Sequence, residues 1–546
     1  MSDTQLPVRP NLEQYKKQAK DLAKNCGLGL PDALARLWRH HPRFHKLPES
    51  PVRTITVTEA QLVLAREHGF ESWPKFSHYI EMVNLIRSVG SLKDPAAAFI
   101  EVACVPRHAD HISGTLEHAE MILSRYPQIA NDSVYTAAIL ADESVVRGFL
   151  SRDPKTATVA GGPYGWDALT HLCFSRYLRI DKARSEAFVR TARALLEAGA
   201  NANTGWYENI DYPTLRPILE SAIYGAAGIA QHPELTRLLL GHGADPNDGE
   251  TPYHVPEGYD NSVMKILLES GKLNGASLSC MLVRKADWHD DEGLRLVLEN
   301  GGVPNLMTQF GGNALHHALR RDNHLKAIAL LLDHGADPAT KNTRDGRSAT
   351  AMAARRGRGD VLALLEQRGV ALGLDGVDRL IAACASGDRE GIQKIVALEP
   401  LLAPELLAEG GTLLAEFAGN GNVEGIQCLL VLGVSVRDLY QLGDPYFDIA
   451  KNSTALHVAA WRAWPAAVKE LIERGAPVDA LDGKGRTALF LATKACVDSY
   501  WTHRRSPDSV EALLRAGASV SGIEIPSGYG AIDELLREYA EKQKQM

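Results

Sequence analysis

A short phrase with paired leucines and a glycine recurs along this chain and constrains its fold more than any other feature. It has the form Leu-Leu-x-x-Gly-Ala, and successive glycines are 44, 28, 30, 34, 34, 64, 42 and 42 residues apart. Periods of roughly 33 residues with insertions are typical of helical repeat proteins, whose units bury apolar faces against each other. The gap of 64 indicates one more unit, near residues 392–403. The repeated glycines are Gly199, Gly243, Gly271, Gly301, Gly335, Gly369, Gly433, Gly475 and Gly517.

Each repeated glycine follows an apolar helical run. Glycine adopts the left-handed backbone conformation that ends a helix without a steric penalty, so each is expected to end a helix and start a hairpin. A second apolar segment lies upstream, most clearly at 313–320, 454–461 and 487–494. Each unit is therefore predicted to contain a helix, a short turn, a second helix and a hairpin loop.

At these residues the chain resembles the ankyrin-repeat family, whose unit carries Thr-Pro-Leu-His-x-Ala followed by Leu-Leu-x-x-Gly-Ala-Asp. The best matches are TALHVA at 454–459 and LLDHGAD at 331–337. The resemblance covers residues 160–520 and weakens at 130–160, where one unit has lost its hairpin. It implies an all-α ankyrin-repeat solenoid of stacked helix-turn-helix units, and His316 then orders a hairpin. A fold of this kind does not by itself specify a function.

The N-terminal region has helical patterns outside the repeats and resembles segments of bacterial ankyrin-repeat proteins. Thr58 and Gln61 have capping-box spacing at a predicted helix start, and Pro74 is predicted near the start of the next helix. This module is expected to cap the first repeat. The predicted parts are a helical module at 1–90, degenerate helical repeats at 91–160, the ankyrin-repeat solenoid with insertions at 161–523, and a C-terminal capping helix at 524–546.

Composition limits the classes of partner and compartment. The net charge of −8 excludes a protein that holds nucleic acid by overall charge alone. Seven cysteines without a CxxC pair favour reduced, buried thiols in a cytoplasmic protein. The sequence contains neither a secretory signal pattern nor an apolar stretch that would span a membrane. We therefore expect a cytoplasmic monomer with no membrane association.

Motifs of known enzymes are missing from the sequence, including nucleotide-binding glycine loops, zinc-protease helices and nucleophile elbows. No cofactor, metal or catalytic residue is predicted, and enzymatic activity stays open. One histidine-rich segment is a candidate metal site, because His108, His111 and His118 lie close together in the sequence among acidic residues. Pro106 and Gly114 interrupt a long helix there. A polar loop cluster is favoured over a metal site.

Aromatic residues gather in the insertions, although they make up only 6% of the chain. Two interpretations stay open: the loops pack their aromatics onto the repeats, or they form a binding pocket. Carboxylates for acid–base chemistry would be Asp167, Glu208, Asp211, Asp260, Asp290 and Asp448, if two converge. The candidate binding residues in the insertions are Trp166, Trp206, Tyr253, His254, Trp288, His289, Tyr446 and Trp501.

The ankyrin resemblance also implies which residues face the concave, binding side of the repeats. Successive repeats place basic pairs there, which would form a stripe for carboxylate, phosphate or sulfate groups. The alternative is that these positions are solvated and simply tolerate basic residues. The residues are Arg284, Lys285, Arg320, Arg321, Arg355, Arg356, Trp461, Arg462 and Lys494.

These features favour a protein-interaction scaffold. A partner with acidic or phosphorylated determinants would lie along the concave groove. The alternative is an enzyme or small-molecule binder whose pocket lies in the aromatic, histidine-rich and acidic insertions. A nucleic-acid binder that uses the basic stripe is disfavoured by the acidic net charge.

Overall fold

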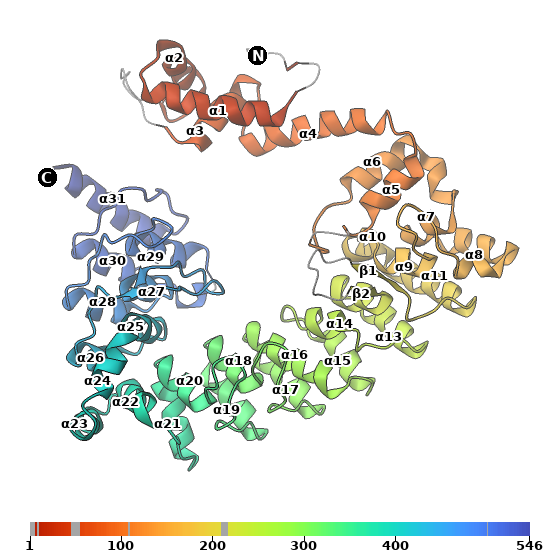
Figure 1. Cartoon of the computed structure of the whole chain (residues 1–546). Helices are drawn as coiled ribbons and strands as arrows, with labels where there is room; N and C mark the ends of the chain where they lie inside the picture. The colour runs from red at the N-terminus through yellow and green to blue at the C-terminus, as the bar shows by residue number, and fades with distance from the viewer. Residues whose placement is uncertain are drawn as a thin grey trace. The chain divides into compact units, whose positions relative to one another are not determined.

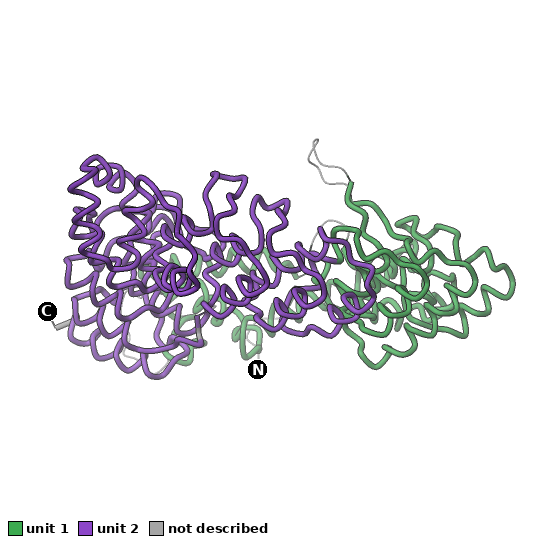
Figure 2. The backbone as a smooth tube through the Cα atoms, turned by 90° about the horizontal axis from the view of Figure 1, so that it is seen from below, with its two compact units in different colours: residues 1–251 green, residues 252–546 purple. Residues whose placement is uncertain are grey.

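The computed structural model describes residues 6–7, 10–44, 55–106, 110–208, 217–499 and 501–545. The chain forms two compact units, Met1–Thr251 (unit 1) and Pro252–Met546 (unit 2), which Figure 2 distinguishes by colour. Their boundary falls inside the stretch 161–523 that the sequence treats as one repeat region. The four-part domain division stays a prediction.

Unit 1 is built from short helices and one small strand pair (Figure 1). Strand β1 (Gly205–Glu208) pairs antiparallel with β2 (Ile218–Ser221), so that Trp206 lies opposite Glu220. The helices are α1 (Leu12–Gly27), α2 (Pro31–His40), α3 (Val57–Glu67), α4 (Trp73–Val89), α5 (Pro95–Ala103), α6 (Glu117–Arg125), η2 (Pro127–Asn131), α7 (Val134–Ile139), α8 (Glu143–Arg152), η3 (Pro154–Ala157), α9 (Ala168–Cys173), α10 (Arg176–Ile180), η4 (Lys182–Arg184), α11 (Ser185–Glu197), α12 (Ala222–Tyr224), η5 (Gly225–Ile229) and α13 (Pro233–Gly241), and α14 (Glu250–His254) spans the unit boundary.

The N-terminal helices α1–α4 bury apolar residues against one another, with Leu22, Leu37 and Val63 in their core. Pro74 lies in the first turn of α4, as expected. The predicted capping box of Thr58 and Gln61 is wrong, because α3 begins two residues earlier. Thr56 caps it, and the Glu59 carboxylate accepts the backbone N–H of Thr56 at 2.8 Å.

Unit 2 is a stack of helix pairs with a second small strand pair, β3 (Leu439–Tyr440) with β4 (Ser453–Thr454). Its helices are α15 (Ser262–Glu269), α16 (Gly275–Asp287), α17 (Asp291–Glu299), α18 (Ala314–Arg320), α19 (Leu325–Asp333), α20 (Ala349–Arg355), α21 (Gly359–Gln367), α22 (Gly376–Ala385), α23 (Arg389–Leu398), α24 (Leu402–Ala408), α25 (Gly410–Gly419), α26 (Val423–Val431), α27 (Ala455–Trp461), α28 (Pro465–Glu473), α29 (Ala488–Val497), η6 (Thr502–Arg504), α30 (Asp508–Arg515) and α31 (Gly530–Gln545).

The hairpin role of the repeated glycines is confirmed. All nine have a positive φ, from 65° at Gly271 to 105° at Gly433. The first helices of neighbouring units pack on one another, as in α16 with α18 and α18 with α20 (Figure 1). The additional unit expected in the 64-residue gap begins with α22 and α23, and the weak unit at 130–160 is the helix pair α7 and α8.

The histidines of the repeat phrase are structural, as the resemblance implied. His457 is buried, and its Nε2 lies 2.9 Å from the Ala480 carbonyl oxygen in the next hairpin. His316 is also buried, and its Nδ1 lies 2.6 Å from Asn313 Oδ1. The seven cysteines are free thiols, and all except Cys280 are buried.

A second left-handed position lies inside each unit, at the turn between its two helices. Glycine occupies this position in three consecutive turns, at Gly357, Gly387 and Gly421, with φ near 70°. In the turns after α16 and α18 the position is held instead by His289 (φ 52°) and Asp322 (φ 52°). A side chain costs about 1 kcal/mol or more in this conformation, and such strain clusters at functional sites. The space around these two turns is therefore a candidate for a functional site.

Candidate functional site

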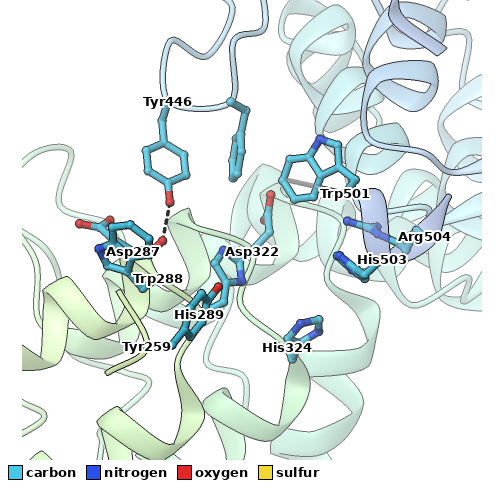
Figure 3. Close-up of a pocket in the computed structure, with 11 residues that line it drawn as sticks. Tyr259, Asp287, Trp288, His289, Asp322, His324, Tyr446, Trp501, His503 and Arg504 are labelled. Carbon is cyan, nitrogen blue, oxygen red and sulfur yellow. Dashed lines mark hydrogen bonds between the residues drawn. The ribbon is translucent and has the colours of Figure 1, made fainter. Parts of the chain in front are cut away.

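A cavity of about 380 Å³ lies within unit 2, where inserted segments meet the turns of the repeats (Figure 3). One side is formed by the turns after α16 and α18 and by the loop before α15. The other side is formed by the insertion between β3 and β4 and by the segment after α29. Its volume is in the range of small-molecule sites. The lining residues are Tyr259, Asp287, Trp288, His289, Asp322, His324, Tyr446, Phe447, Trp501, His503 and Arg504.

Asp322 is the buried anchor of this cavity, with 1% of its side chain exposed. Arg356 donates two hydrogen bonds to its carboxylate at 2.7 Å, and Arg462 donates a third at 2.9 Å. Burial opposes ionisation, but the two guanidinium groups hold the pKa of Asp322 well below its usual range. Because Arg462 lies 140 residues further along the chain, this contact joins distant repeats.

Asp287 closes the cavity on the opposite side. Its carboxylate accepts hydrogen bonds from Arg284, His317 and Arg321 at 2.6–2.7 Å. Its backbone carbonyl accepts the hydroxyl of Tyr446 at 2.8 Å, which is the dashed contact in Figure 3. The loop at residues 441–452 therefore contacts a residue 159 positions earlier in the chain and covers the cavity at this point.

Arg504 carries the cavity's uncompensated charge. Its guanidinium lies 4.3 Å from the Trp464 ring centroid and 5.1 Å from that of Trp501, which holds it by cation–π contacts. Within the described parts of the chain, its Nε has no hydrogen-bond partner, and no carboxylate lies within ion-pair distance. Burial and Arg462 lower the pKa of Arg504 to about 10, although Asp322 opposes this, so the group stays protonated at neutral pH.

Three histidines line the cavity below Asp322 in the view of Figure 3. The ring centroids of His289 and His324 are 6.0 Å apart, and those of His324 and His503 are 6.4 Å apart. Burial, together with the nearby His324 and Arg462, lowers the pKa of His289 to about 4, so its imidazole is neutral at pH 7. Among the residues that the structure describes, no group of three His, Cys, Asp or Glu side chains is placed to hold a metal ion.

The basic residues predicted from the concave register are mostly paired with acids. Arg355 contacts Asp378 and Glu409 at 2.6 and 2.7 Å. Lys285 is fully buried and contacts Asp290 at 2.9 Å. Of the other four, Arg284 and Arg321 donate to Asp287, as described above. Arg356 and Arg462 donate to Asp322. The structure therefore does not present these six as a free basic stripe, because each is paired with at least one carboxylate.

The other three concave positions behave differently. Trp461 is buried, and its ring nitrogen donates to the Phe447 carbonyl oxygen. Lys494 lies over the Trp461 ring, 5.6 Å from the centroid. Arg320 has no acidic partner within ion-pair distance in the described chain. Burial first, and then the positive charge of Arg344, lowers the pKa of Arg320 to about 10. Arg320 and Lys494 are thus the basic members of the predicted stripe that no acid pairs among the described residues.

The predicted aromatic residues separate into three groups. Trp288, His289, Tyr446 and Trp501 line the cavity. Tyr253 lies under the guanidinium of Arg284 at 4.0 Å, and His254 lies 3.2 Å from Glu257, which also pairs with Arg284. Trp166 and Trp206 belong to unit 1 and stack on each other there. The structure therefore holds packed aromatics in one place and a lined cavity in another, and binding in the cavity stays a prediction.

Those candidate carboxylates and histidines that the structure describes do not assemble into an acid–base pair. Asp167 caps α9, Asp290 caps α17, and Asp260 accepts from Ser262. Asp448 pairs with Arg486 at 2.8 Å, while Glu208 ends β1. His111 contacts the Tyr224 hydroxyl at 3.0 Å, and His118 lies in α6. His108 and Asp211 lie outside the described residues.

Sequence reasoning did not single out seven residues of the cavity: Tyr259, Asp287, Asp322, His324, Phe447, His503 and Arg504. One signal was present. The turn position that is glycine in three repeats is His289 and Asp322 in the two repeats at the cavity. A histidine or aspartate at a left-handed glycine position suggests that the side chain is needed there.

Unit 2 is thus a mainly helical repeat stack with a cavity lined by its turns and insertions. A family model described as ankyrin repeats, in three copies, matches residues 282–374 and 414–522. Unit 2 therefore contains ankyrin repeats, and every cavity residue except Tyr259 falls within the two matched ranges. Among solved structures, the chain is similar to the crystal structure of the human ASB11 ankyrin repeat domain. That match has 23% identity and a TM-score of 0.20, and it covers 44% of this chain and 98% of that one.

No helix in the described part of the chain combines the length and apolar character that a membrane crossing requires.

Proposed function

We propose that unit 2 binds a protein partner and contacts acidic or phosphorylated side chains through Arg320 and Arg344. The ankyrin repeats support a protein partner, because such repeats generally mediate protein–protein interaction. The observation that carries the acidic preference is the free charge of Arg320 beside that of Arg344. Free guanidinium groups suit carboxylate and phosphate, which they bind through paired hydrogen bonds.

The local structure supports this contact surface. The hairpin with Arg344 docks on the preceding one, where the Thr343 amide donates to the Gly311 carbonyl at 2.9 Å. Arg344 lies against Gly311, and Arg320 lies near Gly312. Because these two glycines carry no side chains, Arg344 and His316 pack directly against their backbone, which fixes the hairpin beside Arg320.

A peptide array tests this proposal, with full-length chain applied to acidic peptides, phosphoserine peptides and their uncharged counterparts. Acidic and phosphorylated peptides are expected to retain the chain. Arg320→Glu combined with Arg344→Glu should abolish this retention. The matched control is Arg295→Glu with Arg437→Glu, which makes the same charge change at two other exposed sites. Retention unaffected by the first pair, or equal retention by uncharged peptides, would overturn the proposal.

A second candidate function is small-molecule binding in the cavity. The specific observation in its favour is that segments from five parts of unit 2 converge on one cavity of about 380 Å³. Thermal-shift screening of a fragment library against the full chain tests it. Stabilising fragments should lose their effect when His289 is replaced by glycine, which fits the turn but removes the ring. A screen without any stabilising fragment would remove this candidate.

A further inference from the structure

We infer that the cavity of unit 2 takes an aromatic carboxylate. This inference rests on the second candidate function, small-molecule binding, and names its ligand class. It depends on three features of the cavity: the pairing of its arginines, the position of Arg504, and the flat rings of its walls.

The arginines at the cavity differ in their pairing. Five guanidinium groups lie in or behind it: Arg284, Arg321, Arg356, Arg462 and Arg504. Acids lie close to the first four: Asp287 and Glu257 around Arg284, and Asp322, Glu416 and Asp444 around Arg356. Arg504 is the one of the five without an acid partner among the described residues. A ligand carboxylate would give Arg504 the partner that the other four arginines already have.

Arg504 is placed to receive that charge. The rings of Trp464 and Trp501 fix its guanidinium from the sides. Its nearest buried acid, Asp322, already accepts from Arg356, Arg462 and Asn420. Asp322 therefore has little capacity left for Arg504, and an unsatisfied guanidinium nitrogen in a partly buried site is costly. A ligand carboxylate within the cavity would relieve this cost.

The walls favour a flat, apolar body on the ligand. Tyr446 and Trp288 are each 36% exposed, and Tyr259 is 70% exposed, so these rings are partly accessible although Arg321 lies on Tyr446 and Tyr259 packs edge-on against Trp288. Phe447 and Trp501 are buried, with ring centroids 5.6 Å apart, and form the apolar end of the cavity. Aromatic walls contribute large contact area at little entropic cost, and they prefer another flat ring.

Titration calorimetry with the full chain tests the inference. The probes are 2-naphthoate, the neutral 2-naphthamide, and a peptide that ends in tryptophan with a free carboxylate. We expect 2-naphthoate to bind about 10-fold or more tightly than the amide, because a charge-assisted hydrogen bond is lost in the amide. Binding of the peptide as well would assign the carboxylate to a partner's C-terminus, and its failure would assign it to a free small molecule. Either result supports the ligand class.

Two variants locate the contact. Arg504→Gln should weaken 2-naphthoate binding by about 10-fold or more and leave 2-naphthamide binding unchanged. The control is Arg505→Gln, whose guanidinium lies over Tyr529 and does not line the cavity. Thermal melting of each variant verifies its fold, and Arg504→Lys, which keeps the charge, should bind more tightly than Arg504→Gln.

The outcomes separate this inference from the proposed functions. Equal binding of acid and amide would overturn the carboxylate assignment while leaving a small-molecule cavity in place. Binding that survives Arg504→Gln unchanged would overturn it as well. If neither naphthyl probe binds and the fragment screen is also empty, the second candidate function fails together with the inference. The peptide-array result for Arg320 and Arg344 is independent of all three.

Discussion

The aromatic insertions of the two units have similar compositions but different packing. In unit 1, Trp166 and Trp206 stack with centroids 5.3 Å apart, and Phe174 lies against them at 5.7 and 5.9 Å. In unit 2, the Arg462 guanidinium lies against Phe447 and Trp501, 4.1 and 4.2 Å from their centroids. Unit 1 fills its space with rings, whereas unit 2 places charges among them and encloses a cavity.

The difference shows what separates a packed aromatic cluster from a lined site. Rings that pack on rings bury apolar area and need no further partner. A guanidinium among rings must be paired, so unit 2 buries Asp322 beneath them and leaves Arg504 for another acid. Aromatic enrichment alone therefore predicts packing, and a charged group between the rings marks the site.

The largest effect is expected from removing the buried acid of unit 2. Asp322→Asn leaves Arg356 and Arg462 without their carboxylate, which should cost about 3–5 kcal/mol of unfolding free energy. The matched change in unit 1 is Asp181→Asn. Its partner Arg184 is 36% exposed, so the loss should stay below about 1 kcal/mol. Urea unfolding measures both. Equal losses of unfolding free energy in the two variants would show that the buried acid of unit 2 stabilises the fold no more than the exposed pair of unit 1 does.

A ring substitution in each unit distinguishes packing from lining. Trp206→Ala in unit 1 should cost about 3 kcal/mol, because the ring is 4% exposed and the change leaves a cavity. Tyr446→Ala in unit 2 should cost about 1–2 kcal/mol, since the ring is 36% exposed and the change removes one hydrogen bond and the contact with Arg321. Chemical denaturation followed by circular dichroism reports both values. The reverse order would contradict the comparison.

A pH titration tests the charged groups of unit 2 through Asp287. Although burial opposes it, His317 and Arg321 lower the pKa of Asp287 from 3.8 to about 2. Because the folded pKa is the lower one, the stabilisation is complete above about pH 4 and is lost as the pH falls towards 2, by about 2 kcal/mol in all. The stability gap between the wild type and Asp287→Asn should therefore narrow over this range. A difference in unfolding free energy that does not change with pH would contradict the lowered pKa of Asp287.

The smallest effect concerns turn strain, which both units share. Ala463 in unit 2 and Ala141 in unit 1 hold the left-handed turn position with φ of 54° and 57°. Glycine at either position should raise the unfolding free energy by about 0.5–1 kcal/mol, because its backbone adopts this conformation freely. Differential scanning calorimetry of the two single variants measures this as a higher melting temperature. Destabilisation at one position would show that its methyl group contributes more than the strain costs.

Much of the fold was predictable because its signals are local. The Leu-Leu-x-x-Gly phrase places a helix end and a left-handed glycine within a few residues, and all nine glycines have that conformation. The capping box at the start of α3 was misplaced by two residues, because Thr56 with Glu59 and Thr58 with Gln61 fit the same pattern. Only the geometry of the chain entering α3 separates the two.

The candidate site was half predictable. Trp288, His289, Tyr446 and Trp501 were identified as unusual in their insertions, and all four line one cavity. Their meeting was not predictable, because it depends on how the stacked repeats bring positions 140 to 159 residues apart into contact. The concave placement of the arginines stays a prediction. Their neutralisation depends on acids such as Asp322 and Glu409, whose neighbours are set by the stack.

The sequence alone determined the repeat, its helices and hairpins, and the enrichment of rings in the insertions, since each follows from residue type and spacing within one unit. The tertiary structure decided which insertions pack shut and which enclose a cavity. It also decided which positive charges are paired. These are properties of side chains from different units, and they depend on the stacking of repeats and on the burial that stacking creates. Arg504 is the clearest case, because nothing near it in the sequence shows that its charge is left over.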